Sequence, residues 1–101
     1  KFGLKLEDTL ALVQQISRLE HLHIKGLMTI APFVEDPEEN RSIFRQLKQL
    51  SVDIGAKNID NVDMSVLSMG MTGDYQVAIE EGATHVRVGT GIFGERNYDI
   101  K

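Results

Sequence analysis

Segments with the periodicity of helices alternate along this chain with short apolar runs typical of buried strands, and this order limits its possible folds. The strand-like runs are residues 21–31, 64–69 and 85–89, and the helical segments are residues 6–20, 36–55 and 72–82. In residues 6–20 the apolar side chains recur every three or four positions, as on one face of a helix. Helices and strands that alternate through such short connections indicate a parallel sheet with helical crossovers.

Residues that favour helix ends support two of these segments. Asp36 is placed to cap a helix whose first position is Pro37, and Gly55 is a plausible end for that helix. Thr72 is placed to cap the third helical segment, and Gly82 to end it. The chain therefore predicts three parallel strands that alternate with helices.

Two architectures fit this order: a small open α/β sheet, or part of a (β/α)8 barrel, which needs about 250 residues. The chain has 101 residues and begins at Lys1 without an initiator methionine, so we expect a fragment. A net charge of −4 without a basic stripe argues against nucleic acid and membranes as partners. The absence of cysteine fits a cytoplasmic protein, and no histidine pair has the spacing of a helical metal site.

The glycines of residues 89–94 spell G-x-G-x-x-G after the last strand-like run. A dinucleotide site would need a following helix, a further strand and an acidic residue about 20 positions on, and only seven residues follow Gly94. Phosphate binding does not need these further elements and stays possible for the turn. Gly89 and Thr90 lie directly past a parallel strand, where α/β folds bind ligands. A tight turn that needs glycine for its backbone angles remains the alternative.

A second glycine-containing loop follows the preceding strand and opens a helix. It carries Gly70, Thr72 and Gly73. Because adjacent parallel strands end side by side, we expect both loops to converge on one anion. The alternative function of Thr72 is that of a helix cap alone.

Arg87 lies two residues before the glycine turn. Strand alternation places His85, Arg87 and Gly89 on one face, and Val86 and Val88 on the other. Two interpretations of Arg87 stay open, because charged residues are rarely buried without a partner. It either contacts a ligand or forms an ion pair with an internal carboxylate.

The stretch SMGMTGDYQVAIEEGATHVRVGTGIFGER, residues 68–96, closely resembles the YggS/PROSC-type pyridoxal phosphate homeostasis proteins. Their signature reads L-S-M-G-M-S-x-D, then an acidic helix, then V-R-I-G-T-x-I-F-G-x-R. HIKGLMTIAPF and KFGL resemble two further segments of that family, so the match covers nearly the whole chain. The family's fold is similar to the N-terminal barrel domain of alanine racemase. The resemblance implies that residues 1–101 are the C-terminal half of a single (β/α)8 TIM-type barrel.

The resemblance also implies a site for pyridoxal 5'-phosphate (PLP). The implied cofactor-binding residues are Met28, Met71, Thr72, Arg87, Gly89 and Thr90. Arg87 would face the pyridine nitrogen, and Thr72, Gly89 and Thr90 would contact the phosphate. Serine is usual in the family at the position of Thr72, and threonine keeps the hydroxyl. Met28 and Met71 would line the pocket, although methionine also fills gaps in cores.

No segment of this chain matches the family segment with the Schiff-base lysine. Lys25 lies at the start of a strand, away from the expected site. We therefore expect the N-terminal half of the barrel, with that lysine, to be a separate chain or a missing segment.

Three functions fit these sequence features. The first is a non-catalytic PLP-binding protein that stores the cofactor or delivers it to PLP-dependent apo-enzymes in the cytoplasm. The second is a PLP-dependent amino-acid racemase of the alanine racemase type. Arginine stays protonated and leaves the ring nitrogen without a proton, which suits both of these better than an aminotransferase. The third is a stand-alone phosphate-binding α/β domain.

Overall fold

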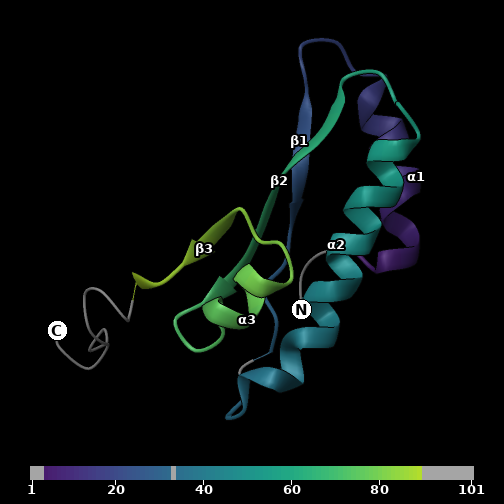
Figure 1. Ribbon diagram of the computed structural model, residues 1–101. Coiled ribbons are helices and arrows are strands. Elements are labelled where there is room, and N and C mark those ends of the chain that lie inside the picture. Colours follow the sequence, from purple (N-terminus) through teal and green to yellow (C-terminus); the bar gives the residue numbers. More distant parts are fainter. Residues whose placement is uncertain (1–3, 33, 90–101) are drawn as a thin grey trace, which may run out of the picture.

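The chain folds around one parallel β-sheet. The computed structural model describes residues 4–32 and 34–89. The elements are α1 (Leu6–Ser17), β1 (Ile24–Met28), the 3-10 helix η1 (Pro37–Asn40), α2 (Arg41–Ala56), β2 (Val62–Met71), α3 (Tyr75–Glu80) and β3 (His85–Arg87). The sheet has three strands in the order β1-β2-β3 (Figure 1). The predicted alternation of helices with three parallel strands is confirmed.

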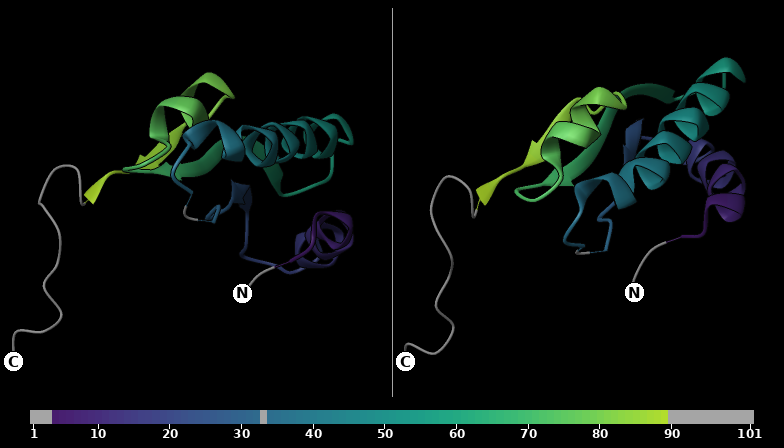
Figure 2. Two further views of the ribbon diagram at one scale, coloured as in Figure 1. Left: turned by 90° about the horizontal axis from the view of Figure 1, so that it is seen from below. Right: turned by 60° about the horizontal axis from the view of Figure 1, so that its bottom comes forward.

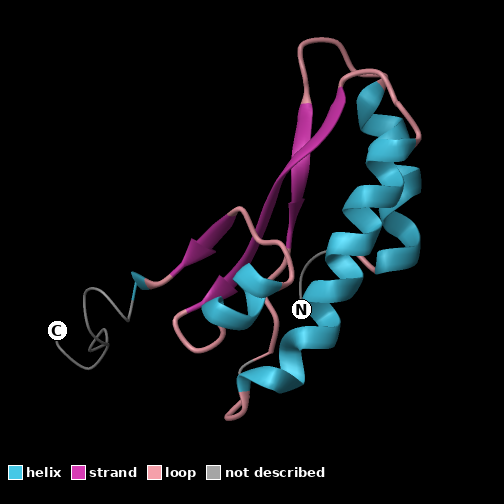
Figure 3. Cartoon of the chain, in the orientation of Figure 1, coloured by secondary structure: helices cyan, strands magenta, loops and turns pink. Residues whose placement is uncertain are grey.

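The strands run in the same direction, so their carboxyl ends share one edge of the sheet (Figure 3). Met28 of β1 is the register partner of Ser68, and Met71 at the end of β2 is the partner of Arg87. The register shifts between Ser68 and Met71, where Gly70 has a left-handed φ of 106°. Met28, Met71 and Arg87 therefore lie toward the same end of the sheet.

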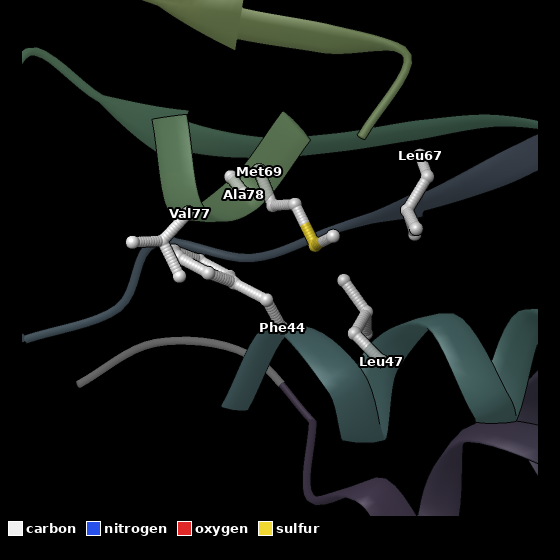
Figure 4. Packing of buried hydrophobic residues seen from close by; sticks show 6 residues of the cluster. All are labelled: Phe44, Leu47, Leu67, Met69, Val77 and Ala78. Carbon is white, nitrogen blue, oxygen red and sulfur yellow. The ribbon is translucent and has the colours of Figure 1, made fainter. Parts of the chain in front are cut away.

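The core lies between the sheet and two helices. Figure 2 shows α2 and α3 on the same side of the sheet, with α1 alongside α2. The buried cluster consists of Phe44, Leu47, Leu67, Met69, Val77 and Ala78 (Figure 4). Leu67 and Met69 point from β2 into this cluster, so Ser68 lies on the opposite face. Near that end of the sheet, Met28 is 63% exposed.

The ends of the helices differ in part from the prediction. Asp36 caps as expected, since its Oδ1 accepts a hydrogen bond from the Glu38 amide at 3.0 Å, but the capped helix begins with the 3-10 turn η1. The predicted end at Gly55 was wrong by one residue, because α2 continues to Ala56. The chain turns two residues later at Asn58, whose φ is 53°; asparagine tolerates this left-handed conformation.

The prediction that Thr72 caps α3 was also wrong. Asp74 occupies the N-cap position, so α3 starts later than expected. Gly82 ends the segment as predicted, with a φ of 106°. Over residues 4–32 and 34–89, no helix has the length and apolar character that crossing a membrane requires.

Candidate functional site

Arg87 reaches across the carboxyl edge of the sheet from the end of β3. Its Nη1 donates to the Ser68 Oγ of β2 at 2.7 Å, and its Nη2 donates to the Thr29 carbonyl after β1 at 3.0 Å. Val86 faces the other way, because its side chain lies beside Gly70 on the side of α3. The predicted opposition of Arg87 and Val86 is confirmed. One guanidinium thus links the ends of all three strands.

The interpretation of Arg87 as half of an ion pair finds no support in the described part of the chain. Among residues 4–32 and 34–89, no carboxylate forms a salt bridge with it. Its Nε is buried and has no hydrogen-bond partner among these residues. A buried donor without an acceptor is costly, since it loses water and gains nothing in return. Within residues 4–32 and 34–89, Arg87 therefore keeps one donor that no acceptor satisfies.

The loop after β2 is held by Asp74. The Asp74 Oδ1 accepts from the Met71 amide at 2.7 Å, and its Oδ2 accepts from the Asn40 Nδ2 at 2.9 Å. Asn40 is buried, and its Nδ2 also donates to the Pro32 carbonyl at 2.9 Å. Three segments that are distant in sequence are thereby joined at the carboxyl edge. Sequence reasoning missed Asn40, because the predicted helix of residues 36–55 placed it inside the helix, where no local pattern indicates its partners.

The residues predicted to bind the cofactor do not all border one hollow. Thr72 lies in a hollow of about 500 Å³ beside η1 and the start of α3. Met28 borders a mainly apolar hollow of about 410 Å³ between α1, β1 and α2. Met71 is the register partner of Arg87 and is 42% exposed. Neither methionine fills the core, where Met69 is fully buried instead.

The glycine turn begins at Gly89, directly after β3. Gly89 is exposed, and no described heavy atom lies within 4 Å of the position where a Cβ would stand. Thr90 lies outside the described residues. The convergence of this turn with the loop of Thr72 on one anion stays a prediction. As far as the described residues extend, the side of Gly89 on which a Cβ would stand is open.

A charged cluster on the outer side was missed by sequence reasoning. Arg41 donates to Glu38 at 2.7 Å, to Glu80 at 2.6 Å and to Glu81 at 2.8 Å, which fastens α2 to α3. Hydrogen bonds from Arg45 and then Arg41 lower the pKa of Glu81, and the hydrogen bond from Arg41 lowers the pKa of Glu38. The three-residue spacing of Glu38 and Arg41 could have predicted their ion pair from the sequence. The contacts of Arg41 with Glu80 and Glu81 could not be predicted in this way, because they form only when α3 packs near α2.

No metal centre is found in the described part of the chain, where no three histidine or acidic residues come together as a possible ligand set. What the carboxyl edge offers is a cationic donor, hydroxyl groups and an open glycine backbone. This combination, on parallel strands joined by helices, defines an α/β protein with a candidate anion-binding edge.

The chain belongs to the family described as "Alanine racemase, N-terminal domain", which matches residues 1–97. A pyridoxal phosphate homeostasis protein of Aquifex aeolicus is 45% identical over 98 residues, which are 97% of this chain and 42% of that protein. The human protein of the same name is 40% identical over 103 residues, which cover 100% of this chain and 38% of that protein. The predicted resemblance is confirmed by these relatives.

A solved structure of PipY from Synechococcus elongatus PCC7942, with PLP bound, is similar with a TM-score of 0.80 and 36% identity. The similarity covers 91% of this chain and 43% of PipY. This chain thus spans less than half the length of the relatives it matches. Because the matching family is described as an N-terminal domain, the comparisons do not confirm the predicted C-terminal placement within the barrel.

Proposed function

We propose that this chain forms part of a pyridoxal 5'-phosphate site in a larger barrel protein that stores or delivers the cofactor in the cytoplasm. The observation that carries the proposal is the buried Nε of Arg87, which has no acceptor among the described residues. The names of the relatives and the PLP bound to PipY support the choice of cofactor.

The donor set fits a pyridine ring better than it fits a metal. Arg87 is a permanent donor, so it favours a ring nitrogen that carries no proton. When bound, PLP supplies an electrophilic carbonyl carbon and a ring that accepts electron density. An unprotonated ring accepts less density than a protonated one. This residue therefore favours holding the cofactor over reactions that build up a full carbanion.

The phosphate is proposed to lie against the backbone of Gly89 and Thr90, with the Thr72 hydroxyl on its other side. Gly89 suits this role because no described atom fills the space in front of its backbone. Gly73, beside Thr72, is equally open. Met71 would line the ring, since it is exposed and pairs in register with Arg87.

A covalent anchor is proposed to come from the remainder of the barrel. Lys25 is exposed and is the second residue of β1, so it stands at the opposite end of that strand from Met28. The three-residue offset corresponds to about 10 Å along the strand. The outer strands β1 and β3 each have one side without a partner in the described sheet, which further strands of a barrel would complete.

The test uses the full-length protein and follows PLP binding by absorbance. Arg87→Gln is expected to weaken affinity about tenfold to a hundredfold, because one charge-assisted hydrogen bond contributes about 1.5–3 kcal/mol. An unchanged affinity in Arg87→Gln would contradict the role of Arg87. Steady racemisation of amino acids by the wild-type protein would replace the storage function with the racemase alternative.

A further inference from the structure

We propose that Ser68 is a positioning residue that sets the orientation of the Arg87 guanidinium for the cofactor ring. This inference rests on the proposed function and assigns a role to a second side chain of that site. The Ser68 Oγ accepts from the Arg87 Nη1 at 2.7 Å, a short distance typical of a hydrogen bond from a charged donor.

The position of Ser68 follows from the packing of β2. Leu67 and Met69 are buried against the helices, so the side chain between them projects from the other face of the sheet. The Ser68 carbonyl also accepts from the Thr29 amide at 3.0 Å. The Ser68 backbone is therefore hydrogen-bonded to Thr29, the residue whose carbonyl also accepts from the Arg87 Nη2.

The two acceptors leave the guanidinium little freedom. Nη1 is held by Ser68 and Nη2 by the Thr29 carbonyl, and both bonds come from the same planar group. The direction of Nε, which lacks a described partner, is then determined by these two bonds. Without the serine hydroxyl only the bond to Thr29 remains, and the guanidinium can rotate about it.

The Ser68 hydroxyl also has a hydrogen-bond donor of its own. An oxygen that accepts from a guanidinium still carries its own O–H donor. No residue within the described ranges accepts a hydrogen bond from the Ser68 hydroxyl. Ser68 and the Nε of Arg87 are thus both donors without described acceptors, which suits a ligand atom that only accepts.

The experiment compares Ser68→Ala, Ser68→Thr and Ser65→Ala in the full-length protein. Ser65 is an exposed serine on the same strand and serves as the matched control. Ser68→Ala is expected to weaken PLP binding about tenfold, a size typical for the outer partner of a binding group. The absorption maximum of the bound cofactor is expected to shift as well, because the donor facing the ring moves. Ser68→Thr, which keeps the hydroxyl, should restore both properties, and Ser65→Ala should change neither.

A purely structural role for Ser68 would lower the unfolding midpoint of the cofactor-free protein and leave affinity and spectrum unchanged, which would overturn the inference. Failure of Ser68→Thr to restore binding would overturn it too. If Ser68→Ala does not fold, Ser68→Cys keeps the side-chain volume with a weaker acceptor and should show the same loss. A wild-type protein that binds no PLP would overturn the proposed function and this inference with it, whereas normal binding by the variants overturns the inference alone.

Discussion

Asn40 donates its side-chain amide to the Asp74 carboxylate at 2.9 Å and joins the start of α2 to the loop after β2. The two residues are 34 positions apart in the sequence. Asn40 is 2% exposed, so this bond lies in a protected environment. The other Asp74 oxygen holds the Met71 amide. The loop that carries Thr72 is therefore fixed at both ends by one carboxylate.

Asn40→Ala is expected to lower the free energy of unfolding by about 1–3 kcal/mol, because Asp74 and the Pro32 carbonyl both lose their buried donor. Denaturant unfolding of the full-length protein measures this difference. Gln46→Ala is the control, since Gln46 is exposed and makes only a local bond to Ser42. Its effect should stay within about 0.5 kcal/mol. Equal effects of the two variants would contradict the importance of the Asn40–Asp74 bond.

The Arg41 cluster predicts a loss of stability in acid. The pKa values of Glu38 and Glu81 are lowered from 4.5 in the folded protein, so their contribution is complete above that pH. It is lost as the pH falls below 4.5 through the folded-state pKa values, where the carboxylates protonate and release Arg41 and Arg45. Thermal unfolding between pH 7 and pH 3 should show this decline.

Arg41→Gln should make the same acid-induced decline shallower, because Glu38 then loses its charged donor at every pH and Glu81 keeps only its bonds to Arg45. Arg18→Gln removes the same charge from an exposed position outside the cluster and should keep the wild-type slope. Parallel slopes for wild type and Arg41→Gln would show that other carboxylates control the acid transition.

Gly26→Ala is expected to destabilise the sheet by about 1–3 kcal/mol or more, as overpacking does. A Cβ at this position would stand 1.7 Å from the Val66 carbonyl oxygen, so β1 and β2 would have to separate. Gly73→Ala is the matched control, because no described atom lies within 4 Å of its Cβ position. Its unfolding free energy should stay within about 0.5 kcal/mol of the wild-type value.

Gly89→Ala separates ligand binding from folding. The added methyl meets no described atom, so the unfolding midpoint of the cofactor-free protein should not change. PLP affinity should fall about tenfold, or about 1.4 kcal/mol, because the methyl occupies the space proposed for the phosphate. Gly55→Ala, whose Cβ would make only an ordinary contact of 3.7 Å with Met64, should leave affinity unchanged. If Gly89→Ala binds PLP as tightly as the wild-type protein, Gly89 does not belong to the cofactor site.

Local sequence determined the order of the elements and the faces of the last strand. Apolar spacing and capping residues depend on neighbours within a few positions, so the three strands, the Asp36 cap and the opposition of Arg87 and Val86 could be predicted. The carboxyl edge as the place of the candidate site followed from the parallel order alone.

The partners of each side chain were decided by tertiary structure. That Arg87 bonds Ser68 and Thr29, and no carboxylate of the described residues, depends on the register of three strands and on the shift at Gly70. Asp74, and not Thr72, occupies the N-cap position of α3, and its carboxylate accepts from Asn40, which is 34 positions away in the sequence. Arg41 meets Glu80 and Glu81 only after α3 folds against α2. Such contacts join residues that are tens of positions apart, and their geometry depends on how helices and strands pack, which no local pattern encodes.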